Sequence, residues 1–73
     1  MKINVLRIEK ELALQGLTKK RLAELAGMHR QNLTTVLNRG SCEAITAGKI
    51  SKALGVDIVE IMQQERESDH EAG

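Results

Sequence analysis

The sequence contains no aromatic residue, no proline and a single cysteine among its 73 residues. Without Phe, Tyr or Trp, any core must be built from aliphatic side chains. Proteins that bind single-stranded nucleic acid or specific RNA sequences usually stack the bases on aromatic rings, so the composition disfavours that class. The absence of proline leaves helices free to form anywhere along the chain.

Metal, redox and enzymatic signatures are also missing. Cys42 has no second cysteine for an intramolecular disulfide, and neither Cys42 nor His29 belongs to a cluster with metal-ligand spacing. We find no Ser/His/Asp set, no HExxH pattern and no glycine-rich phosphate loop. The first residues alternate charged and apolar types, which is unlike a signal peptide or a membrane span. We therefore expect no metal, no cofactor, no enzymatic activity and a cytoplasmic location.

The charge is distributed unevenly, although the net charge is only +1. Residues 1–40 hold eight Lys and Arg against three Glu, a net charge of +5. Residues 41–73 hold three Lys and Arg against seven Asp and Glu, a net charge of −4. The first half is therefore the part that would meet a polyanion.

The apolar spacing predicts an all-α fold, a compact bundle of five helices. The expected helices are about 3–15, a short helix between Thr18 and Gly27, about 30–37, one from Ser41 or Cys42 to about Ala53, and one that opens at Asp57. We predict that Ile45, Ile50, Ala53 and Leu54 face the core from the fourth helix, where Gly48 would allow close helix contact. Residues 1–64 would form one domain, and residues 65–73 a polar tail, which we expect to be disordered.

Local signals mark the helix ends. Thr18 is placed to cap the second helix, and Gly16 and Gly27 are typical residues just past a helix C-terminus. Asp57 and Glu60 have the spacing of a capping box. Only Gly27, Met28 and His29 separate the second and third helices, and a turn this short holds two helices at a steep angle.

Residues 17–62 resemble the lambda-repressor/Cro-type helix-turn-helix (XRE) family. The resemblance is carried by the segments LT at 17–18, LAELAGM at 22–28, LTTVLNRG at 33–40 and KISKALGV at 49–56. The chain departs from the family pattern after the threonine cap, where Lys19, Lys20 and Arg21 replace the usual Gln-Glu-Glu. Cations in a first helical turn oppose the helix dipole, and a bound phosphate would reverse that effect.

The resemblance implies that the chain binds double-stranded DNA with its third helix in the major groove. It places Arg30 and Gln31 at base edges, where Arg suits guanine and Gln suits adenine. Thr35 would contact a thymine methyl group, and Asn32 and Thr34 a base or a phosphate. We expect four further residues to contact phosphate: Lys19, His29, Asn38 and Arg39. An alternative role for His29 is to cap the third helix.

The sequence thus predicts a sequence-specific transcriptional regulator, a repressor that binds DNA as a homodimer and associates with the nucleoid. One alternative is the antitoxin of a toxin–antitoxin pair, whose acidic tail residues Glu65, Glu67, Asp69 and Glu71 would engage a basic toxin. A second alternative is an adaptor that kept this fold for protein contacts.

Overall fold

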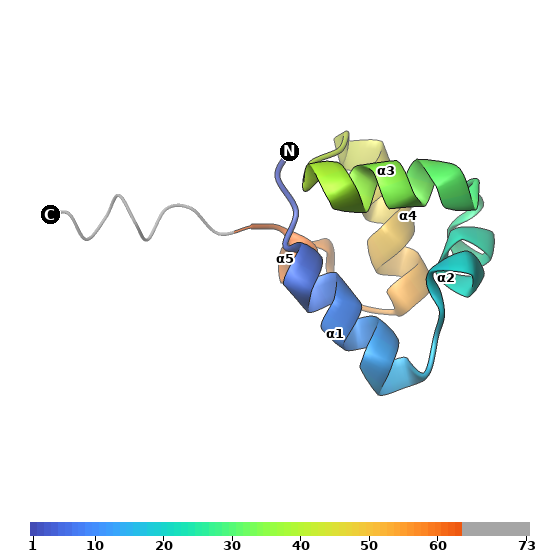
Figure 1. The fold of residues 1–73 in the computed structure, drawn as a ribbon. Helices are drawn as coiled ribbons and strands as arrows, with labels where there is room; N and C mark the ends of the chain where they lie inside the picture. The colour runs from blue at the N-terminus through green and yellow to red at the C-terminus, as the bar shows by residue number, and fades with distance from the viewer. Residues whose placement is uncertain (64–73) are drawn as a thin grey trace, which may run out of the picture.

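The computed structural model describes residues 1–63, which form five helices (Figure 1). In chain order these are α1 (Val5–Gln15), α2 (Lys19–Ala26), α3 (Arg30–Arg39), α4 (Ala44–Leu54) and α5 (Ile58–Ile61). The predicted all-α, five-helix class is confirmed. The predicted boundary between domain and tail lies outside the described residues.

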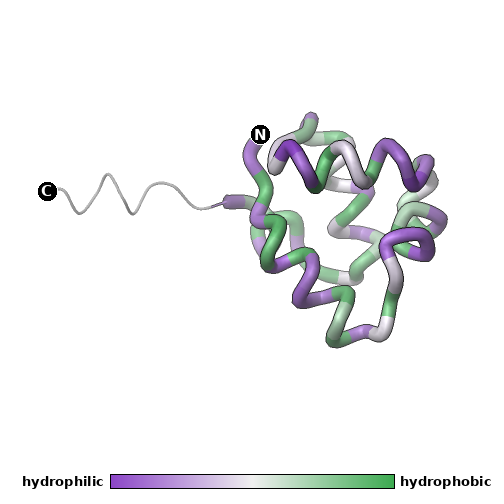
Figure 2. The backbone as a smooth tube through the Cα atoms, in the orientation of Figure 1, coloured by the Kyte–Doolittle hydropathy of each residue, from purple (hydrophilic) through white to green (hydrophobic). Residues whose placement is uncertain are grey.

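Each helix contributes one fully buried aliphatic side chain to a single core. These side chains are Ile8, Leu22, Leu33, Ile50 and Ile61, one from each of α1 to α5. Smaller residues such as Ala23 and Ala47 let the helices approach between them. Figure 2 shows the hydrophobic positions alternating with hydrophilic ones along each helix, as amphipathic helices around one core require.

Side-chain caps begin three of the helices. The carboxamide oxygen of Asn4 accepts the N–H of Arg7 at 3.0 Å, and the hydroxyl of Thr18 accepts the N–H of Arg21 at 3.1 Å. The carboxylate of Asp57 accepts the N–H of Val59 at 3.0 Å, but the side chain of Glu60 pairs with Arg7 instead of completing a capping box. His29 occupies the N-cap position of α3 without a side-chain hydrogen bond, so the capping alternative for His29 is wrong.

The N-terminal residues are extended, so α1 begins two residues later than predicted. They lie between the linker that follows α3 and the end of α5. The N–H of Ile3 donates to the carbonyl of Gly40 at 3.0 Å, and that of Asn4 donates to the carbonyl of Ile61 at 2.7 Å. Isolated antiparallel bridges, Lys2 with Ser41 and Ile3 with Met62, complete the arrangement.

Four predictions about α3 and α4 need correction. Helix α3 continues to Arg39, two residues beyond the predicted end, and α4 begins at Ala44 because residues 41–43 are extended beside the N-terminal segment. Ile45 is 72% exposed and does not belong to the core. A Cβ on Gly48 would meet no heavy atom within 4 Å, so close helix contact does not explain this glycine.

Candidate DNA-binding surface

Helices α2 and α3 form a helix-turn-helix in which Gly27 makes the sharp turn possible. Gly27 has φ 72°, a left-handed conformation that glycine adopts without steric cost. Its N–H bonds to the end of α2, and the N–H of Met28 donates to the carbonyl of Ala23 at 2.9 Å. Both helices then turn their buried faces to the core, and the outer face of α3 is left to solvent.

The predicted reading residues all lie on that solvent-exposed face of α3. Arg30, Gln31, Asn32, Thr34 and Thr35 are exposed, whereas Leu33 and Leu37 between them are buried. Since 3.6 residues make one turn, the same periodicity that anchors α3 also gathers these polar groups on the other side. The structure therefore brings together five of the nine residues predicted from the sequence.

Most of these side chains have no hydrogen-bond or ion-pair partner among residues 1–63. The hydroxyl of Thr35 donates to the carbonyl of Gln31 at 3.0 Å, which leaves the methyl group and the acceptor lone pairs of the hydroxyl for other contacts. Within residues 1–63, the polar groups of Arg30, Gln31, Asn32 and Thr34 make no hydrogen bond or ion pair of their own. Their bonding capacity is free for an external ligand.

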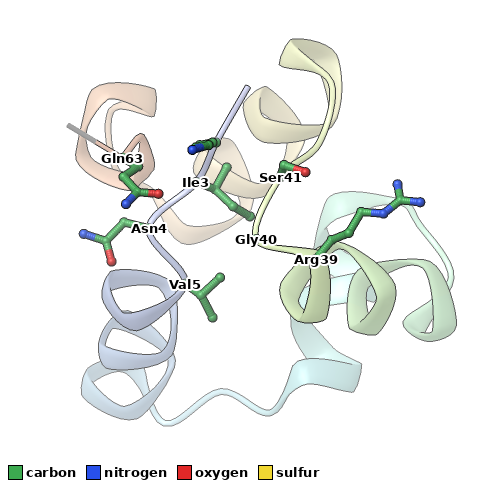
Figure 3. A pocket seen from close by; sticks show the side chains of 8 residues that line it. Ile3, Asn4, Val5, Arg39, Gly40, Ser41 and Gln63 are labelled. Carbon is green, nitrogen blue, oxygen red and sulfur yellow. The ribbon is translucent and has the colours of Figure 1, made fainter. Parts of the chain in front are cut away.

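The end of α3 is beside the N-terminal segment, where a hollow of about 490 Å³ opens (Figure 3). Arg39, Gly40 and Ser41 line one side, and Lys2 to Val5 line another, with Gln63. Figure 3 shows the Arg39 side chain extending away from Ile3 and Asn4. Arg39 is exposed on the side of the hollow that the end of α3 forms. Asn38, on the preceding position of α3, is also exposed.

The basic first turn of α2 is partly neutralised by the protein itself. The ammonium of Lys19 lies 3.7 Å from a carboxylate oxygen of Glu9 on α1, and Arg21 lies 3.1 Å from Glu24. All four side chains are about half-exposed, and ion pairs of this kind contribute about 0–1 kcal/mol to stability. Such weak pairs leave Lys19 able to exchange Glu9 for a phosphate. His29, the residue before α3, is exposed, and its ring makes no hydrogen bond within residues 1–63.

Two features near this surface were not predicted from the sequence. Arg7 on α1 pairs with Glu11 at 2.9 Å and with Glu60 on α5 at 3.0 Å, and so ties α5 to α1. In addition, Thr46 and Lys49 of α4 share a hollow with Asn32 and Thr35 of α3. Both features depend on contacts between distant segments, which no local pattern reveals.

Residues 1–63 contain no cluster of side chains suited to a metal ion and no helix suited to span a membrane. No three His, Cys, Asp or Glu side chains in this range gather closely enough to hold a metal ion. Cys42 is half-buried, and its burial raises the pKa of the thiol. None of the helices in this range has both the length and the apolar character needed to cross a membrane.

The short turn between α2 and α3, the buried back of α3 and its polar outer face define a helix-turn-helix domain. Residues 7–67 match the family model of the Cro/C1-type HTH DNA-binding domain, and the chain belongs to that family. DNA is therefore the partner that its fold and family support. Comparisons with curated proteins and with solved structures give no match.

Proposed function

We propose that the protein is a sequence-specific, double-stranded DNA-binding regulator that reads the major groove with α3. The observation that carries this proposal is the outer face of α3, where exposed polar side chains without internal partners stand on a helix fixed by Leu33 and Leu37. A B-DNA major groove is about 12 Å wide and admits one α-helix.

The order of residues on α3 suits base recognition. Arg30 and Gln31 open the helix, and in a helix-turn-helix the first residues of the second helix meet the base edges. The guanidinium of Arg30 can donate two bonds to guanine, and the amide of Gln31 can pair with adenine. Thr35 offers its methyl group to thymine one turn later, between Asn32 and Asn38.

Contacts to phosphate would position the helix without reading sequence. We assign this role to Lys19 and His29 at one end of the motif and to Asn38 and Arg39 at the other, with Asn32 and Thr34 contacting base or phosphate. Binding at a promoter would exclude other proteins from the occupied groove, so we propose that the regulator acts as a repressor in the cytoplasm, on the nucleoid.

We also propose that the protein binds DNA as a homodimer. The supporting observation is apolar surface outside the core: Leu6 and Leu14 on α1, Ile45 on α4 and Val59 on α5 are all more than half exposed. A two-fold dimer would place its two α3 helices about one helical turn of DNA apart, roughly 34–36 Å. Ile61 cannot serve this contact because it is completely buried.

Selection from a random duplex pool tests the proposal. The protein is incubated with the pool at two salt concentrations, and bound DNA is recovered and sequenced. An enriched palindrome with half-sites about 10–10.5 base pairs apart would support a dimeric regulator. Loss of enrichment at separate positions in Arg30→Ala and Gln31→Ala would assign the bases that each residue reads, with Lys10→Ala on the exposed side of α1 as a control.

Other outcomes of this selection would contradict the proposal. Binding that falls steeply with salt and enriches no sequence would indicate phosphate contacts alone and an architectural role. No binding at low salt would favour the adaptor. Capture of a basic toxin by the acidic segment after Gln63 would add the antitoxin function to DNA binding.

A further inference from the structure

A hollow between α3 and α4 joins part of the proposed reading face to α4. Its volume is about 330 Å³, and it is lined by Met28, Asn32, Thr35, Val36, Thr46 and Lys49. Asn32 and Thr35 are two of the residues assigned to DNA above, whereas Thr46 and Lys49 lie on the opposite wall. Helix α4 lies behind α3 in Figure 1, and the hollow is lined by residues of both helices.

No acidic residue of α4 offsets the positive charge on the wall formed by Thr46 and Lys49. Helix α4 carries Lys49 and Lys52 and no Asp or Glu between residues 44 and 54. In the described part of the chain, the ammonium of Lys49 has no ion pair and no hydrogen bond. This differs from Lys19 and Arg21, each of which has a carboxylate within 4 Å. Lys49 is therefore a cation that lies beside the proposed DNA-binding face and has no partner within residues 1–63.

A helix bound in the major groove would bring a DNA phosphate close to the ammonium of Lys49. A helix inserted into the major groove has a phosphate backbone on each side, because the groove is only about 12 Å wide. Lysines and threonine hydroxyls on structure beside such a helix are typical phosphate donors. The wall formed by Thr46 and Lys49 lies where one of the two backbones would pass.

We infer that Lys49, assisted by the hydroxyl of Thr46, is an additional contact to a DNA backbone phosphate beside α3. This inference rests on the proposed function, since it requires α3 to occupy the groove. It enlarges the DNA-binding surface from the helix-turn-helix to α4, a helix for which the sequence predicted no contact. The contact is to phosphate, so it adds affinity without adding sequence preference.

Lys52 provides a matched control on the same helix. It is also an exposed lysine without an ion pair among residues 1–63, and it lies three positions along α4. It lines a different hollow, with Leu25, Ala26, Ala53 and Lys49 itself, and it does not line the hollow that contains Asn32 and Thr35. A general effect of positive charge would make Lys49 and Lys52 equivalent, whereas a specific contact separates them.

The test measures the affinity of the full chain for its selected duplex between 50 and 200 mM salt. Each phosphate contact contributes about 0.9 to the slope of log K against log salt. We expect Lys49→Ala to lower the slope by about 0.9, so that the wild-type protein loses about 3.5-fold more affinity than the variant over this range. Lys52→Ala should retain the wild-type slope, and Lys49→Arg should restore it.

Further measurements distinguish failure of the Lys49 inference from failure of the proposed function. The Lys49→Ala loss should be the same on the selected and on a scrambled duplex, because a phosphate contact carries no sequence information. A wild-type slope for Lys49→Ala, or equal losses for both lysine variants, would overturn the inference while leaving the proposed function intact. Failure of the wild-type protein to bind any duplex would overturn both. Circular dichroism of each variant shows whether it is folded.

Discussion

Removing Glu9 should strengthen DNA binding, although Glu9 lies outside α3. Its carboxylate is 3.7 Å from the ammonium of Lys19, the residue assigned to a phosphate at the start of α2. A phosphate bound by Lys19 would come within roughly 7 Å of Glu9, a separation at which two negative charges in water repel by about 0.6 kcal/mol. Salt near 0.1 M reduces this repulsion to about 0.3 kcal/mol. We therefore expect Glu9→Gln to raise the affinity about twofold.

The assay is a titration of labelled duplex at 50 and 200 mM salt, with the gain largest at low salt. Stability should change by no more than about 1 kcal/mol, because the lost ion pair is half-exposed. A double-mutant cycle provides the control: in a Lys19→Gln background, the same Glu9→Gln change should give a smaller gain. An unchanged or weaker affinity for Glu9→Gln, or an equal gain in both backgrounds, would refute the assignment of Lys19.

The remaining predictions concern stability and the thiol. Leu33→Ala removes a fully buried side chain and should destabilise the protein by about 2–5 kcal/mol in urea unfolding; a smaller loss would contradict the anchoring role of Leu33. Gly48→Ala should stabilise it by about 0.5–1 kcal/mol, because α4 has space for a methyl group there, whereas Gly27→Ala should cost about 1–2 kcal/mol at φ 72°. A shared sign for the two glycine variants would contradict this reasoning. Desolvation raises the pKa of Cys42, opposed by the N-terminal ammonium and reinforced by Glu43, so iodoacetamide should alkylate the native thiol more slowly than the urea-unfolded one near pH 8. The stabilisation that accompanies this raised pKa is fully present at a pH below the pKa of the thiol in the unfolded protein. It should decline as the pH rises through the pKa of the thiol in the folded protein, and Cys42→Ser should weaken that decline.

Features set by neighbouring residues were predictable from the sequence. The caps at Thr18 and Asp57 and the helix ends at Gly16 and Gly27 follow from hydrogen bonds that span two to five residues. The spacing of Leu33 and Leu37 likewise determines which face of α3 is buried, and therefore which residues remain exposed. The candidate surface was predictable because exposure on an amphipathic helix follows directly from its periodicity.

Features that depend on distant segments were not predictable. The late start of α4 follows from the extended N-terminal segment, which pairs with residues 40–42 and keeps them out of the helix. Ile45 looked like a core residue from its apolar character alone, but in the first turn of α4 it faces solvent. The Arg7–Glu60 pair joins helices far apart in sequence, and the Lys19–Glu9 pair joins the consecutive helices α1 and α2. Composition and periodicity carry no information about such partners.

The residues that orient α3 and those that face outward form separate sets. Leu33 and Leu37 hold the helix by burial, and Gly27 determines how it leaves α2. Leu33 and Leu37 are buried and unavailable to DNA, and Arg30 and Gln31 make no side-chain hydrogen bond or ion pair within residues 1–63. Substitution at Arg30 or Gln31 should therefore alter base preference while changing stability by less than about 0.5 kcal/mol.

This separation leads to a stronger expectation about specificity. Because the backbone of α3 does not depend on its outer side chains, Gln31→Arg should keep the fold and move the preference at its base pair toward guanine. Selection from the random pool and thermal unfolding of the same variant measure both quantities. A changed preference with an unchanged melting temperature is the expected result. A variant that unfolds would show that the fold does depend on the outer side chains of α3, and a folded variant that selects the wild-type sequence would show that residue 31 does not read DNA.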